Sequence, residues 1–155
     1  MRPSRSLALL ILAIAISSLP AAAKDLAVVV NKSNATKNVA LADLTKLCKA
    51  STPKWPDGKD VVLVLRDPAS PEMRLVLQKI YGMSADDVRS LITGANQTRK
   101  DRILIVGSDD AVIKAVEAIP GAVGIVDVYS ITSGITVVKV DGKMPLESGY
   151  VLHGF

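Results

Sequence analysis

The sequence has very few residues that carry covalent or metal chemistry. Cys48 is the one cysteine and His153 the one histidine among 155 residues. An internal disulfide is therefore excluded, and with His153 near the end of the sequence no Ser-His-Asp or Cys-His arrangement suggests itself. No HExxH, CxxC, EF-hand, P-loop or GxGxxG pattern occurs. We therefore expect a protein that is not an enzyme, binds no metal and needs no cofactor.

Aromatic residues and excess charge are also scarce. Aromatic side chains make up 3% of the sequence, too few for a platform on which sugars or bases stack. The formal net charge is +4, and it falls to +2 without Arg2 and Arg5. This small surplus gives no electrostatic reason to expect binding to nucleic acid.

The first 23 residues have the pattern of a secretory signal peptide. Arg2 and Arg5 precede an apolar run over residues 7–16, and the small residues Ala21-Ala22-Ala23 follow. The pattern predicts cleavage after Ala23, export to the periplasm or the medium, and one domain over residues 24–155. The apolar run is too short to span a bilayer, and nothing later resembles a membrane span.

Apolar segments alternate with helical patterns along the rest of the chain. Strands are predicted at residues 26–30, 61–65, 103–106, 124–128 and 135–140. Helices are predicted from residue 39 to 48, from 70 to 80, from 84 to 93 and from 108 to 119. This alternation predicts an α/β fold with a mostly parallel central sheet. Cys48 lies on an apolar helix face and is interpreted as a core residue, whereas Asn96 and Thr98 are assigned to a polar loop.

The stretch from Val61 to Arg74 is predicted to form the centre of the protein. Val61 to Leu65 consists of valine and leucine only, as in a strand buried on both faces. Ser70 suits the N-cap of the next helix, and Pro71 suits its first position. A helix that begins at the carboxyl end of a parallel strand offers N–H groups to an anion.

The order of these landmarks resembles the type 2 periplasmic binding protein superfamily, specifically the phosphate transporter substrate-binding-like domains. The matching segments are Val28 to Asn31, Leu41 to Leu44, Trp55-Pro56-Asp57-Gly58, Arg66 with Ser70, and Ala118 to Asp127. The resemblance implies a three-layer lobe that binds phosphate or a similar small oxyanion. It also implies a partner, either the permease of an ABC transporter or another protein.

The resemblance further implies which residues contact the ligand. Arg66 and Ser70 match an anion-gripping loop, Asp67 could supply an acceptor, and Ser33 matches a hydroxyl after the first strand. Pro71 and Glu72 depart from the family pattern, because they remove one backbone donor and one hydroxyl and add a carboxylate. Arg66 could instead pair with Asp67 or Glu72. A ligand-free protein-interaction or structural module built on the same lobe is therefore the alternative.

Overall fold

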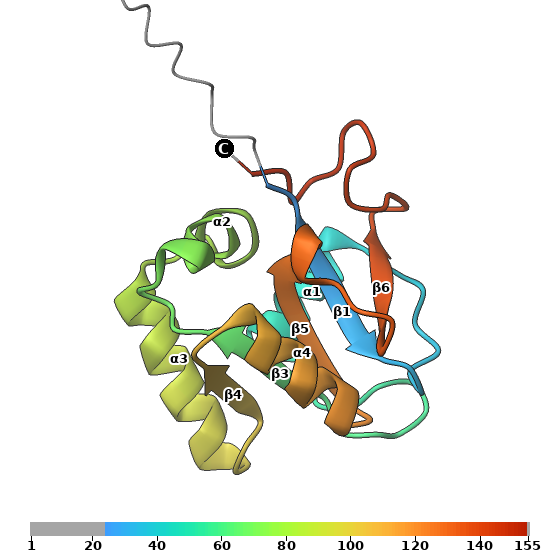
Figure 1. The fold of residues 1–155 in the computed structure, drawn as a ribbon. Coiled ribbons are helices and arrows are strands. Elements are labelled where there is room, and N and C mark those ends of the chain that lie inside the picture. Colours follow the sequence, from blue (N-terminus) through green and yellow to red (C-terminus); the bar gives the residue numbers. More distant parts are fainter. Residues whose placement is uncertain (1–23, 155) are drawn as a thin grey trace, which may run out of the picture.

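The computed structural model describes residues 24–154, so the predicted signal peptide lies outside the described residues. Six strands form one sheet in the order β2-β6-β1-β5-β3-β4 (Figure 1). The strands are β1 Leu26–Asn31, β2 Asn38–Val39, β3 Val62–Arg66, β4 Ile103–Val106, β5 Ala122–Asp127 and β6 Ile135–Val140. β1 pairs antiparallel with β5 and β6, and the other pairs are parallel. The predicted mostly parallel sheet is confirmed.

Helices cover both faces of the sheet. They are α1 Leu41–Cys48, the 3-10 turn η1 Pro71–Met73, α2 Arg74–Val76, the π-helical turn η2 Leu77–Tyr81, α3 Ala85–Thr98, α4 Asp109–Ala118 and the 3-10 turn η3 Val128–Ser130. α4 packs on one face, and α1, α3 and the continuous helical segment 71–81 share the other (Figure 1). This arrangement has the three layers that the family resemblance implies. No helix within residues 24–154 is long and apolar enough to cross a membrane.

The alternation of side chains along β3 explains why both faces are covered. Leu63 and Leu65 belong to the larger core cluster, whereas Val64 belongs to the cluster beneath α4. Successive residues of a strand point to opposite faces, so an unbroken apolar run needs a helix layer on each side. β3 lies between β5 and β4 and is parallel to both.

Three predicted helix boundaries are confirmed by their hydrogen bonds. The Ser84 hydroxyl accepts a hydrogen bond from the Asp87 N–H, and the Ser108 hydroxyl accepts one from the Ala111 N–H. Gly82 ends segment 71–81 with a left-handed φ of 60° and donates its N–H to the Leu77 carbonyl. Glycine adopts this conformation without the steric cost that a Cβ brings.

The assignment of residues 94–98 to a loop is wrong, because α3 continues to Thr98. The Asn96 amide donates to the Ile103 carbonyl and accepts from the Ile103 N–H, both at 2.9 Å. Ile103 begins β4, which is an edge strand of the sheet, so this pair of bonds fixes the end of α3 to that edge. These tertiary bonds offset the low helix propensity of Gly94 and Asn96.

Cys48 is a core residue, as the sequence indicates. Its side chain is fully buried, and this burial raises the pKa of the thiol to about 12. The neighbouring carbonyl of Cys48 accepts a hydrogen bond from the buried Tyr81 hydroxyl at 2.9 Å. α1 is thereby joined to the end of segment 71–81.

The two ends of the described chain meet at the start of β1 (Figure 1). The Leu26 N–H donates to the Leu152 carbonyl, and the buried Asp25 carboxylate accepts from the Leu146 N–H. The other oxygen of Asp25 lies 2.6 Å from Nδ1 of His153. The C-terminal segment is therefore held against the start of β1.

Gly124 of β5 lies where α4 packs closely on the sheet. A Cβ at Gly124 would lie 2.5 Å from Cγ1 of Val112 and 3.1 Å from Cγ2 of Val116. We expect Gly124→Ala to lower the free energy of unfolding by about 1–3 kcal/mol, because these branched side chains have little room to move. Urea unfolding followed by circular dichroism measures the change.

Gly94→Ala is the matched control for Gly124→Ala. Gly94 lies inside α3, and a Cβ there would meet nothing within 4 Å. The substitution should raise the free energy of unfolding by about 0.5–1 kcal/mol, because alanine favours the helix. Equal effects of the two substitutions would contradict the close packing of α4 on β5.

Candidate functional site

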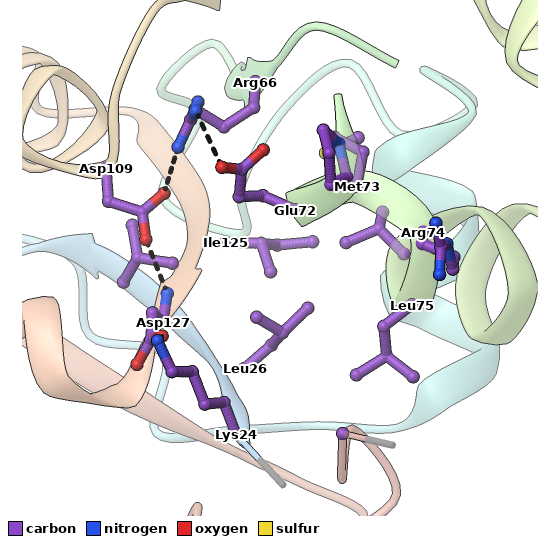
Figure 2. A pocket seen from close by; sticks show the side chains of 14 residues that line it. Lys24, Leu26, Arg66, Glu72, Met73, Arg74, Leu75, Asp109, Ile125 and Asp127 are labelled. Atoms are coloured by element: carbon purple, nitrogen blue, oxygen red, sulfur yellow. Dashed lines mark hydrogen bonds and ion pairs between the residues drawn. The ribbon is translucent and has the colours of Figure 1, made fainter. Parts of the chain in front are cut away.

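A pocket opens at the end of the sheet where β3 and β5 finish and β1 begins (Figure 2). Its volume is about 380 Å³. Segment 71–81 forms one wall, the strand ends and the start of α4 form others, and Lys24 and Gly154 from the two chain ends complete it. Ligands of open α/β sheets bind outside the carboxyl ends of the strands. The pocket is therefore at the position that the fold class favours.

Arg66, the last residue of β3, lies at the edge of this pocket, and its side chain is only 17% exposed. Its Nη1 donates to Oδ1 of Asp109 at 3.1 Å, and its Nη2 lies 3.5 Å from Oε1 of Glu72. Asp109 is nearly as shielded as Arg66, whereas the Glu72 side chain is half exposed. Arg66 thus has one firm partner and one loose partner (Figure 2).

Asp109 joins elements that are distant in the sequence. It is the first residue of α4 and follows β4, the parallel neighbour of β3. Its Oδ2 accepts from the Asp127 N–H at 3.0 Å, at the end of β5, and lies 3.4 Å from the Ser130 hydroxyl. One carboxylate therefore fixes the end of β5 and the orientation of the Arg66 guanidinium.

The remainder of the pocket is mainly apolar. Figure 2 shows Leu26, Met73, Leu75 and Ile125 around the open space between the sheet and segment 71–81. Met73, Leu75 and Ile125 belong to the buried core, and Leu26 is half-buried. On the rim, Nζ of Lys24 lies 3.3 Å from Oδ2 of Asp127. A ligand in this pocket would meet charged groups at the rim and carbon atoms inside.

Ser70 and Asp67 are close to Arg66 in the chain, but their polar atoms are used within the loop. The Ser70 hydroxyl donates to the Asp67 carbonyl at 2.6 Å and does not cap the following helix. The Asp67 carboxylate accepts from the Ala69 N–H and from Arg89 of α3, both at 2.8 Å. The Ala69 bond first and Arg89 second hold the pKa of Asp67 below its ordinary value. Neither Ser70 nor Asp67 lines the pocket.

Ser33 and Arg66 lie at opposite ends of the sheet's strands. β1 runs antiparallel to β5 and β6, so Asn31 at its carboxyl end is paired with Ile135 at the start of β6. The Ser33 hydroxyl donates to the Asn31 side chain at 2.8 Å, and that side chain donates to the Val116 and Glu117 carbonyls at the end of α4. The structure therefore does not bring the predicted pair Ser33 and Arg66 into one site.

Sequence reasoning missed Asp109 and Lys24 as pocket residues. A usable signal existed for Asp109, because Ser108 marks a helix start immediately after a predicted parallel strand, and such starts meet at one sheet edge. No comparable signal existed for Lys24, since the direction of β1 cannot be read from its apolar residues. Within residues 24–154, no three His, Cys, Asp or Glu side chains gather closely enough to hold a metal ion.

No protein-family model matches the sequence, and no curated protein matches it. Solved structures do match the fold. They include an ABC-type phosphate transport receptor from Vibrio cholerae (TM-score 0.62, 20% identity, 86% of this chain and 55% of that chain) and PstS from Borrelia burgdorferi (0.65, 14%, 86% and 55%). A candidate phosphate ABC transporter substrate-binding protein from Clostridium perfringens, solved with bound phosphate, also matches (0.69, 20%, 86% and 54%).

The fold of this chain is thus that of substrate-binding proteins of phosphate ABC transporters, and the predicted fold class is confirmed. At these identities the match concerns the fold alone. The chain spans about half the length of these proteins. The matched structures are binding proteins rather than enzymes.

Asp109→Ala tests the bond that orients Arg66. We expect the substitution to lower the free energy of unfolding by about 1–3 kcal/mol, because it leaves the shielded Arg66 guanidinium without its firm partner. Asp110→Ala is the control, since Asp110 is the adjacent acidic residue of the same helix turn and is exposed. Asp110→Ala should cost less than about 1 kcal/mol. Urea unfolding measures the free energy of unfolding of both variants. Equal losses of stability would contradict the role given to Asp109.

Proposed function

We propose that this chain is a non-enzymatic, periplasmic or secreted module that binds phosphate or a similar small oxyanion at Arg66, and that it serves an ABC transporter permease. The observation that carries the proposal is the shielded guanidinium of Arg66, which has one firm carboxylate partner and one that an anion can displace. The fold shared with phosphate-binding proteins, one of them solved with phosphate, supports it.

Displacement of Glu72 by a ligand is energetically reasonable. The Arg66–Glu72 contact is 3.5 Å long and the Glu72 side chain is half exposed, and such ion pairs contribute about 0–1 kcal/mol. Charge-assisted hydrogen bonds from arginine to a phosphate oxygen contribute roughly 1.5–3 kcal/mol each, and arginine can form two in parallel. Asp109 would meanwhile keep Arg66 in place at the strand end.

The second candidate is a ligand-free module that binds another protein. The observation that favours it is the presence of two carboxylates, Asp109 and Glu72, on the guanidinium that an anion would need. The matched part of this chain also covers only 55% of these binding proteins. In this case phosphate at millimolar concentration would give no heat of binding, and, where the partner is a second copy of this chain, the mass in sedimentation would rise with protein concentration.

Isothermal titration of phosphate into the purified protein tests the first candidate. We expect saturable binding that Arg66→Ala weakens tenfold or more, because the charged hydrogen bonds are lost. Glu72→Gln should strengthen binding by about two- to fivefold, because it removes a competing carboxylate.

Arg99→Ala is the matched arginine control for this titration. Arg99 pairs with Asp60 and the Val61 carbonyl at the amino end of β3, away from the pocket. Its removal should leave the phosphate affinity unchanged. Binding that survives Arg66→Ala would contradict the assigned site. If phosphate gives no heat of binding with the unmodified protein, the second candidate is favoured.

Export tests the proposed location. When the full sequence is expressed in a bacterial host, we expect the protein in the periplasmic fraction or the medium with Lys24 as its first residue, because Ala21-Ala22-Ala23 fits a cleavage site. Intact-mass spectrometry identifies the first residue. A protein that stays in the cytoplasm and retains residues 1–23 would contradict the prediction.

A further inference from the structure

We infer that the ligand of the Arg66 pocket is an oxyanion with an apolar substituent, such as a short alkylphosphonate or a phosphate monoester. This inference rests on the proposed function, because it places the anionic end of the ligand at Arg66. It adds the part of the ligand that fills the remainder of the pocket.

The volume of the pocket exceeds what a bare anion fills. Its volume is about 380 Å³. Pockets for small organic ligands begin at about 300 Å³. A phosphate ion has only a few non-hydrogen atoms, so with phosphate at Arg66 a large part of this space would still hold water.

The wall beyond Arg66 has the wrong chemistry for further phosphate oxygens. Leu26, Met73, Leu75 and Ile125 come from β1, the helical segment 71–81 and β5, and their side chains donate no hydrogen bonds (Figure 2). Polar groups that lose water without gaining a partner destabilise a complex. Methylene groups placed against this wall, chiefly against the half-exposed Leu26, would instead release water with a gain in free energy.

The charges of the pocket fit a ligand with one anionic group. Three cations line it, Lys24, Arg66 and Arg74, and so do three carboxylates, Glu72, Asp109 and Asp127. Lys24 pairs with Asp127, and Arg66 pairs with Asp109 and Glu72. A ligand with several phosphates would meet these carboxylates, whereas one phosphonate needs only Arg66. The inferred ligand therefore has one charged end and one apolar end.

A titration series tests the inference on the purified protein at neutral pH. The probes are phosphate, methylphosphonate, propylphosphonate and pentylphosphonate, with 1-pentanol as the uncharged arm. We expect the affinity to rise about three- to fourfold for each methylene that reaches the wall, the value that apolar transfer gives. 1-Pentanol should bind far more weakly than pentylphosphonate, because it has no group for Arg66.

Each outcome of the series distinguishes the inference from the proposed function. Phosphate binding with no gain along the alkyl series would overturn the inference and leave the proposed function in place. No binding of phosphate or of any phosphonate would overturn both. Pentanol binding as tightly as pentylphosphonate would overturn the inference, because the anionic end would then contribute nothing.

A variant pair locates the apolar contact. Leu26→Ser should reduce the gain per methylene, because Leu26 is the half-exposed member of the apolar wall. Ile105→Ser is the control: Ile105 is 42% exposed on β4 and does not line the pocket, so the series should be unchanged. A thermal unfolding curve of each variant confirms that it is folded. The unmodified protein alone decides the inference if Leu26→Ser folds poorly.

Discussion

Asp109 accepts a hydrogen bond from Arg66 through one carboxylate oxygen and from the Asp127 N–H through the other. These bonds join the ends of β3 and β5 to the first turn of α4, and they set the direction in which the guanidinium points. A guanidinium on a free side chain loses conformational entropy when it binds a ligand, whereas one that is already oriented loses less. Through the same carboxylate, the end of β5 with Asp127 is held beside the end of β3 with Arg66.

The same contact limits how strongly an anion can bind. Asp109 and Glu72 neutralise the charge of Arg66 when the pocket has no ligand. A shielded arginine without a partner would be costly, so a single lobe that keeps such an arginine at its edge needs an internal carboxylate. Glu72 is close enough to serve in part and exposed enough to leave. The pocket thus combines a permanent partner with a replaceable one.

The sequence allowed the order of strands and helices to be predicted, because strand burial, caps and helix stops depend on neighbouring residues. The run of valine and leucine before Arg66, the caps Ser84 and Ser108 and the stop at Gly82 are of this kind. The exception to the predicted order is β2, since the sequence pattern places Val39 in the following helix. The composition of the site was harder to predict, because it depends on strand direction. β1 is antiparallel to its neighbours β5 and β6, so Ser33 lies at the end of the sheet away from the pocket, and Lys24 lies at the pocket. The Asn96 contact with Ile103 is likewise tertiary and left no periodic signal.

The Asn96 amide lies where a further strand would pair with Ile103 of the edge strand β4. Immediately before β4 the Arg102 carbonyl accepts from the Leu63 N–H of β3, while the N–H and carbonyl of Ile103, the first residue of β4, bond to the amide of Asn96. A side-chain amide can present an N–H and a carbonyl oxygen in one plane, as a peptide group does, so it satisfies both backbone groups of Ile103 without extending the sheet. Sheet edges with unpaired backbone groups recruit other chains and cause aggregation. Asn96 therefore closes the Ile103 position of the β4 edge to pairing with a strand of another copy.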